Sequence, residues 1–316
     1  MRRCAILFAV VSLLLPVSAF AQSQAPEAAV NLFNNALKKT GNGDLDGAIE
    51  DYTRAITLSS HFGTSKNAGN SFTGDKNAAS EEVTIVDPFT ANAYCNRGLA
   101  RYQKGDNAGA IEDFNKAIRI RPGLATAYVN RAAALRATGD LPAALKDLDR
   151  AIALEKDFFQ AYCNRGSLYL DLGDHNAALA DLNRSIELND HFAQAFYQRG
   201  YVYIALKNFD AAVTDFNRAV RLAPEMASAY QGRGTALMFK GQMLEAVNDF
   251  NRALERNPNM DTAYCNRGLV KLYLGDESEA QKDFAECLRL KPQFKAELER
   301  RIVLARQLRQ IGKSEK

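Results

Sequence analysis

The hexapeptide AYCNRG occurs at residues 93–98 and returns unchanged at 161–166 and 263–268. The starts lie 68 and 102 residues apart, and both distances are multiples of 34. A word that is repeated in phase over such a period indicates an array of stacked units rather than one domain with a single core. The word is either part of the architecture or a binding site that is used several times.

A 34-residue frame that starts at Ala91 shows what each place contributes. The eighth place holds Gly in every unit except one, which has Ala132, the twentieth always holds Ala, and the twenty-fourth always holds Phe or Leu. Small residues let two helices cross closely, and the large residue fills the space beyond the crossing. Turn residues such as Gly105 and Asp106 separate two helical stretches, and Pro closes four of the six units. Each unit is therefore predicted to be a pair of antiparallel helices.

This pattern resembles the tetratricopeptide repeat family. The resemblance implies an all-α fold, a right-handed superhelical solenoid of seven helix-turn-helix repeats. A weaker first repeat is placed at 29–58, where Ala36, Ala48 and Tyr52 take the signature places. The six regular repeats are 91–124, 125–158, 159–192, 193–226, 227–260 and 261–294.

Two segments outside the regular repeats determine the predicted domain boundaries. The helix of the first repeat is predicted to end near Leu58, which leaves 59–86 as a flexible insertion and 87–90 as the turn before the second repeat. A tolerated surface loop is the plain interpretation, and a functional flap is the alternative. Residues 295–316 are expected to form a basic capping helix and tail, since a terminal repeat needs a helix with one solvated side. The predicted apolar face of that helix consists of Leu298, Ile302, Ala305 and Leu308.

The N-terminus has the pattern of an export signal. Arginines at positions 2 and 3 precede about a dozen apolar residues, and A-F-A at 19–21 matches a cleavage motif. We therefore expect 1–21 to be a signal peptide, 22–28 to be a short N-terminal segment and the processed chain to act in a bacterial periplasm. The apolar run is short for a permanent span, and no second long one follows, so no integral membrane span is expected after cleavage.

Composition argues against several function classes. The 40 basic and 37 acidic residues leave no excess of positive charge that would indicate a nucleic-acid partner. The three His residues, His61, His175 and His191, fall at or beside predicted turns, and the sequence has no metal-binding motif, phosphate loop or nucleophile elbow. We expect no catalytic residue, no metal and no cofactor, so the protein is predicted not to be an enzyme.

Four cysteines follow the predicted signal. Cys95 and Cys163 lie two repeats apart, which is too far for a disulfide. Cys265 and Cys287 share one repeat and are the pair that can meet. The place of Cys287 elsewhere holds Ala or Ser, which favours a small packed thiol instead. The sequence leaves the oxidation state of this pair open.

In the family that the sequence resembles, the first helices line a concave groove that holds partner peptides. The sixth place carries an amide in five of the six regular repeats, and an amide side chain can pair with any peptide backbone through its donor and its acceptor. This row resembles the asparagine ladder inside the superhelix of O-linked N-acetylglucosamine transferase. The alternative is that these amides only bond neighbouring helices. The predicted peptide-binding residues are Asn96, Asn130, Asn164, Gln198 and Asn266, together with the aromatic residues Tyr102, Tyr197, Tyr201, Phe239 and Tyr273.

The function implied by the resemblance is a non-enzymatic scaffold that binds extended protein segments in the cell envelope. The basic residues with which co-chaperone repeats clamp a terminal carboxylate are missing here. The alternative is a module associated with a membrane or the cell wall through its basic C-terminal helix, in which 295–316 carries seven Lys or Arg against three Glu. The clamp positions are occupied by Phe33, Leu37, Thr126 and Asn130.

Charged residues also recur in phase. Asp stands at the twenty-third place of all seven repeats and Arg at the seventh place of the later six. Pairing each Asp with the Arg of the next repeat strands no residue, because Arg301 follows Asp283 by 18 residues, like the other pairs. Pairing within repeats leaves Asp51 and Arg301 without a partner. We therefore predict seven ion pairs between repeats.

Overall fold

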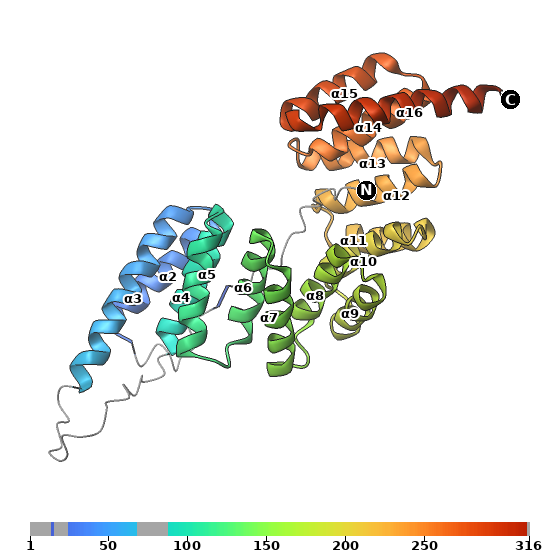
Figure 1. Cartoon of the computed structure of the whole chain (residues 1–316). Coiled ribbons are helices and arrows are strands. Elements are labelled where there is room, and N and C mark those ends of the chain that lie inside the picture. Colours follow the sequence, from blue (N-terminus) through green and yellow to red (C-terminus); the bar gives the residue numbers. More distant parts are fainter. Residues whose placement is uncertain (1–13, 16–24, 68–87, 315–316) are drawn as a thin grey trace. The chain divides into compact units, whose positions relative to one another are not determined.

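The structure is a computed structural model that describes residues 14–15, 25–67 and 88–314 (Figure 1). All secondary structure in these described residues is helical. The chain divides into two compact units after Leu168, inside helix α8 (Phe159–Leu172). The predicted signal peptide and the greater part of the predicted insertion lie outside the described residues.

The first unit consists of helix pairs in which each helix packs on the next along the chain. The second helix of each regular pair begins where an Asp side chain caps it, as Asp106 does by accepting a hydrogen bond from the Gly109 N–H. The helices are α2 (Glu27–Gly41), α3 (Leu45–Asn67), α4 (Pro88–Lys104), α5 (Asn107–Ile120), α6 (Ala125–Thr138), α7 (Leu141–Leu154) and the first part of α8.

The second unit continues the same pattern. Gly275 ends α14 in the left-handed conformation, with φ of 103°, which a glycine adopts without strain. The elements are the last turn of α8, α9 (His175–Leu188), α10 (Ala193–Ala205), α11 (Phe209–Leu222), α12 (Ala227–Phe239), α13 (Met243–Arg256), α14 (Asp261–Leu274), α15 (Glu277–Leu290), a 3₁₀ turn (Pro292–Phe294) and α16 (Lys295–Ser314). The all-α helix-turn-helix prediction is confirmed.

The small and large places of the frame meet as expected at the helix crossings. A Cβ added at Gly268 would lie 2.6 Å from the Phe284 ring, and one added at Gly200 would lie 2.8 Å from the Phe216 ring. Both separations are far below van der Waals contact. The eighth place is therefore small because the ring at the twenty-fourth place lies directly against it.

The predicted boundaries around the insertion are wrong at both ends. Helix α3 continues to Asn67 instead of ending near Leu58, and α4 begins at Pro88 instead of Ala91. The start of the extension contacts α4, since the Thr90 hydroxyl donates to the buried Ser59 hydroxyl at 3.0 Å. The beginning of the predicted loop thus belongs to the helical core.

The C-terminal helix caps the last repeat, although not with the whole predicted face. Leu298 is 1% exposed, and Ile302 and Ala305 pack against the same apolar cluster. Leu308, in contrast, is 50% exposed. Helix α16 has 20 residues and α14, on which it packs, has 14, so the last turns of α16 extend beyond their support.

The predicted ion pairs between repeats are wrong, because the carboxylate partner lies in the same repeat. Five of the seven Asp residues at the twenty-third place accept two hydrogen bonds each from the Arg sixteen residues before them, on the facing helix of the same pair. Asp51 is not stranded, because Lys39 in its own repeat lies 2.7 Å away. The fork-like pairs are Arg97–Asp113, Arg131–Asp147, Arg199–Asp215, Arg233–Asp249 and Arg267–Asp283, with N···O distances of 2.5 to 2.9 Å.

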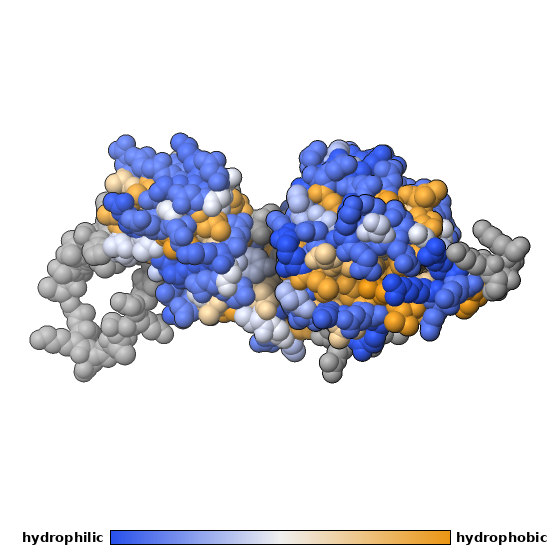
Figure 2. Space-filling view, turned by 90° about the horizontal axis from the view of Figure 1, so that it is seen from above, coloured by the Kyte–Doolittle hydropathy of each residue, from blue (hydrophilic) through white to orange (hydrophobic). Residues whose placement is uncertain are grey.

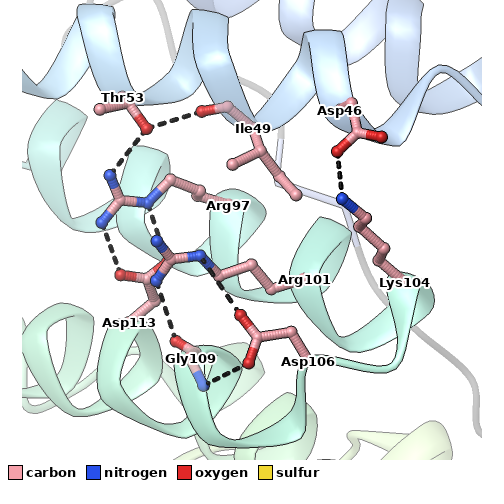
Figure 3. Close-up of polar contacts among 9 residues, drawn as sticks. All are labelled: Asp46, Ile49, Thr53, Arg97, Arg101, Lys104, Asp106, Gly109 and Asp113. Atoms are coloured by element: carbon pink, nitrogen blue, oxygen red, sulfur yellow. Dashed lines mark hydrogen bonds and ion pairs between the residues drawn. The ribbon is translucent and has the colours of Figure 1, made fainter.

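The same arginines also reach the preceding repeat, through a different partner. The Arg97 guanidinium bridges Asp113 on α5 and the Thr53 hydroxyl on α3 (Figure 3). In four other repeats the second partner is the twenty-fifth-place Asn Oδ1, at 2.6 to 2.7 Å. Arg165 instead reaches the exposed Asp149 carboxylate of the preceding repeat at 2.7 Å, whereas in these four repeats arginine links its neighbour through a neutral acceptor. These contacts are Arg131–Asn115, Arg199–Asn183, Arg233–Asn217 and Arg267–Asn251.

Candidate functional site

The Asn96 side chain on α4 pairs with the backbone of a single residue through both of its polar groups. The Leu15 N–H donates to Asn96 Oδ1 at 2.9 Å, and Asn96 Nδ2 donates to the Leu15 carbonyl at 2.8 Å. Two strands that face each other in an antiparallel sheet exchange the same pair of bonds. The amide of Asn96 thus holds a backbone without reading its side chain.

The two described residues of this segment differ in burial. Leu15 is partly buried against an apolar cluster that includes Cys95, Leu99 and Phe114, whereas Leu14 is 39% exposed. Alternation between neighbours is what an extended chain produces. Tyr102, one of the predicted groove aromatics, packs against the same cluster.

Asn130 lies one repeat further along the first unit and is 2% exposed. Its Nδ2 donates to the Cys95 sulfur at 3.7 Å. Burial raises the pKa of the Cys95 thiol to about 12, so the sulfur is a neutral and weak acceptor at physiological pH. The amide of Asn130 is therefore held close to the position where Asn96 meets the backbone.

Asn164 and Gln198 each bury an amide atom that has no hydrogen-bond partner within the described part of the chain. The atoms are Asn164 Nδ2 and Gln198 Oε1, and Gln198 as a whole is 2% exposed. Asn164 also lines a small pocket next to Ala133 and Arg136. An unpaired buried polar atom costs about 1–3 kcal/mol, so such atoms indicate where an external polar group fits.

Asn266 behaves differently from the other members of the row. Its Nδ2 donates to the Thr235 hydroxyl at 3.3 Å, and its Oδ1 accepts from the Arg301 guanidinium at 2.9 Å. Both polar groups are engaged by neighbouring helices. Asn266 therefore bonds neighbouring helices, as the alternative interpretation of the amide row expects. It connects the last repeat to the C-terminal helix and is not a free peptide-binding residue.

The predicted groove aromatics divide between core and surface. Tyr197 and Tyr201 are 2% and 7% exposed and lie edge-on to the Phe216 ring, so they belong to the core of the second unit. Tyr273 is half-buried. Phe239 is 54% exposed and stacks on Phe209 at 5.2 Å.

The break in the amide row at Gly232 has a packing cause that the sequence pattern did not reveal. A Cβ at Gly232 would lie 2.4 Å from the Phe216 ring of the preceding repeat, so no amide fits there. The available signal was Tyr201, since 193–226 is the one regular repeat with an aromatic residue at both the ninth and the twenty-fourth place. Its ring lies 5.3 Å from that of Phe216, centroid to centroid.

Cys265 and Cys287 form a disulfide that joins α14 to α15, with a Cα–Cα distance of 5.4 Å. This answers the question that the sequence left open. Cys95 and Cys163 are buried free thiols, and burial raises the pKa of both. Across residues 14–15, 25–67 and 88–314, no three His, Cys, Asp or Glu residues gather as metal ligands, and no helix has the length and apolarity to cross a membrane.

A relative with a known role matches part of the chain. The heat-shock protein cognate co-chaperone sgt12 of Aspergillus fumigatus is 32% identical over 120 residues, which are 33% of this chain and 35% of the relative. The match thus spans about a third of the relative's length.

Solved structures share the fold. A tetratricopeptide repeat protein from Parabacteroides merdae has a TM-score of 0.61 at 19% identity, over 89% of this chain and 99% of the other. The Cut9–Hcn1 structure of the APC/C has a TM-score of 0.62 at 19% identity, over 67% and 42% of the respective chains.

Family models agree with the frame read from the helices. A TPR repeat model matches 98–139 and 133–173, and tetratricopeptide repeat models match 163–227, 197–261 and 261–294. Together these matches run without a gap over more than half of the chain. With its helix pairs and their small and large crossing residues, the chain belongs to the tetratricopeptide repeat family.

Proposed function

We propose that this protein is a non-enzymatic scaffold that holds extended segments of partner proteins on the amides of its first helices, in the bacterial cell envelope. Tetratricopeptide repeats imply a scaffold for protein–protein interaction. The finer proposal is carried by one observation, the buried and unpaired amide atoms of Asn164 and Gln198 at the sixth place of their repeats. The export pattern at the N-terminus supports a periplasmic location.

The chemistry of the row favours a backbone rather than a charged terminus as the bound group. An amide side chain offers one acceptor and two donor hydrogens, which match the N–H and C=O of an extended chain. Asn96 makes this pair of bonds with Leu15. Bonds between neutral groups of this kind are each worth about 0.5–1.5 kcal/mol net and depend little on salt.

The test starts with capture of partners from a periplasmic extract and identification of the segment that binds. Affinity of that segment is then measured for two single variants, Asn164→Ala in the first unit and Gln198→Ala in the second unit. One of the two should lose about two- to tenfold, from one hydrogen bond. The matched control replaces Asn176 and Asn259, which are exposed, by Ala. Unchanged affinity in both variants, each with full helicity by circular dichroism, would refute the role of the row.

A second candidate function, peripheral contact with a membrane or the cell wall, is favoured by the exposed stripe on α16. Val303, Leu304, Leu308 and Ile311 are 50 to 55% exposed. Figure 2 shows hydrophobic surface that interrupts the hydrophilic cover of the second unit. Apolar residues on a basic helix suit the boundary of an anionic membrane.

Point variants test this candidate better than removal of the helix, because α16 buries Leu298 in the core. Replacement of Leu304 and Leu308 by Gln is expected to abolish sedimentation with anionic liposomes while leaving partner affinity intact. If the wild-type protein does not sediment with liposomes or cell-wall fragments, this candidate is wrong.

A further inference from the structure

Large apolar side chains are exposed beside the turns of the second unit. The fourteenth place of the frame, where the first helix of a pair ends, holds Leu172, Leu206 and Leu274, which are 44 to 47% exposed. In the first unit the same place holds the polar residues Lys104 and Thr138. The helix pair itself therefore does not require a leucine at this place, and the exposed leucines are a feature of the second unit.

Contacts between neighbouring turns show that these side chains lie along one edge. Phe209 at the start of α11 stacks on Phe239 at the end of α12, with ring centroids 5.2 Å apart. Lys240 Nζ lies 2.6 Å from an Asp210 carboxylate oxygen across the same two turns. We call the apolar surface beside these turns the turn edge, and it consists of Leu172, Leu206, Phe239, Leu244 and Leu274.

The turn edge is acidic, whereas the exposed stripe of α16 lies on a basic helix. The four turn segments carry seven Asp or Glu against two Lys, and 295–316 carries seven Lys or Arg against three Glu. The two charges already meet within one chain, because Arg309 of α16 lies 3.6 Å from Glu277 beside the last turn. The turn segments are 171–174, 205–210, 239–245 and 273–279.

Neither apolar surface is large enough for a stable interface by itself. The turn edge has five exposed side chains and the stripe has four, which together are nine of the eleven large apolar side chains exposed in the described residues. Each exposes on the order of 100 Å², whereas a standard interface buries about 800 Å² on each partner. Only an interface that covers both surfaces of a copy reaches this size.

We propose that the partner is a second copy of this chain, and that α16 of each copy lies on the turn edge of the other. Such a dimer has two-fold symmetry and covers both surfaces of both copies with one kind of contact. The cations of α16 then lie near the acidic turns of the other copy, so the attraction adds to the apolar burial and weakens with salt. The proposal does not rest on the binding of extended segments.

Sedimentation equilibrium of the full chain at micromolar concentrations tests the dimer. The edge variant carries Leu206→Gln and Leu244→Gln, and the stripe variant carries Leu304→Gln and Leu308→Gln. Each variant should raise the dissociation constant of the dimer at least about tenfold, because it removes exposed leucines from both contacts. Leu58→Gln is the control, since this leucine is 39% exposed on α3 of the first unit, and it should leave the constant unchanged. Circular dichroism checks that every variant keeps its helicity.

A mixture of the two variants separates this arrangement from a pairing of the two α16 stripes. In a mixed dimer, α16 of the edge variant meets the turn edge of the stripe variant, so one of the two contacts keeps its wild-type residues. The mixed dimer should therefore be at least about tenfold tighter than the dimer of either variant alone. Pairing of the stripes would instead leave the edge variant as dimeric as the wild type, which would overturn the proposal.

Two further outcomes also overturn it. The first is a wild-type chain that remains a monomer at every concentration, and the second is a mixture that dimerises no better than its components. If the monomer sediments with anionic liposomes and the stripe variant does not, the stripe contacts a membrane instead of a second copy. None of these results decides the role of Asn164 and Gln198, which partner affinity measures separately.

Discussion

Arginine 233 provides the sharpest test of how the repeats are held together. Its Nε and Nη2 each donate to Asp249 at 2.6 Å within one repeat, and its Nη1 donates to Asn217 of the preceding repeat at 2.7 Å. Asp249 is 3% exposed, whereas the Arg233 side chain is 16% exposed. The hydrogen bond that Arg233 donates to Asp249 is the main cause that raises the pKa of Arg233, so the guanidinium is charged at neutral pH.

Replacement of Arg233 by Met leaves the Asp249 carboxylate buried without its cation. Loss of one partner of a buried pair costs about 3–5 kcal/mol, and we expect the lower end because the arginine is partly hydrated. Asn217→Ala removes one bond from a guanidinium that water reaches, which should cost about 1 kcal/mol. Arg252→Met, on the exposed side of α13, is the control and should stay within about 0.5 kcal/mol.

Urea unfolding at pH 7, followed by circular dichroism, supplies these free energies. Double-mutant cycles then separate the two models of pairing. Coupling of Arg233 to Asp249 should reach about 2–3 kcal/mol, and coupling of Arg233 to Asp215 in the preceding repeat should stay below about 0.5 kcal/mol. Coupling to Asp215 that equals or exceeds coupling to Asp249 would refute pairing within repeats.

Three further predictions concern packing, covalent linkage and pH. Gly232→Asn, which would complete the amide row, should destabilise the second unit by about 1–3 kcal/mol in urea unfolding, because its Cβ meets the Phe216 ring at 2.4 Å. Reduction of the Cys265–Cys287 disulfide, which spans 22 residues, should lower the unfolding free energy by about 3 kcal/mol, measured with and without reductant. Burial raises the pKa of Tyr197 to about 12, so the unfolded chain loses this proton first as pH rises above about 10. The free energy of unfolding should therefore fall between pH 10 and pH 12. The fall should be about 2–3 kcal/mol smaller in Tyr197→Phe than in the wild type. An equal fall in both proteins would contradict the raised pKa of Tyr197.

The sequence predicted the apolar helix crossings inside each repeat. Gly268 and Phe284 recur at fixed places because each pair of helices must cross at the same point, and the helix boundaries follow from that crossing. The carboxylate partner of each arginine was predicted wrongly. The prediction counted the Asp and Arg residues that would lack a partner at the ends of the array, and it ignored which helix faces lie opposite each other. Arg97 and Asp113 are 16 residues apart in sequence but stand on opposing faces of one helix pair.

Contacts that do not recur with the 34-residue period could not be predicted from the repeat pattern. Ser59, at the start of the extension of α3, bonds Thr90 across 31 residues, and the engagement of Asn266 depends on Arg301 of the cap. For the candidate site, the row identified Asn96 as a residue that holds a backbone, and the contact with Leu15 has that geometry. The row alone contained no information about which segment is held.

The pairing of each arginine inside its own repeat has a consequence for how such a chain changes in evolution. Five of the six regular 34-residue cassettes pair their own buried Asp with their own Arg, and Lys39 does the same for Asp51 in the first repeat. Such a cassette, when it is duplicated, deleted or left at the end of the array, therefore strands no buried carboxylate. The link that is lost at a new end is a bond from a partly hydrated arginine to a neutral acceptor, such as Asn217, and water can replace it. The number of repeats can thus change during evolution at little electrostatic cost, while each cassette keeps its fold.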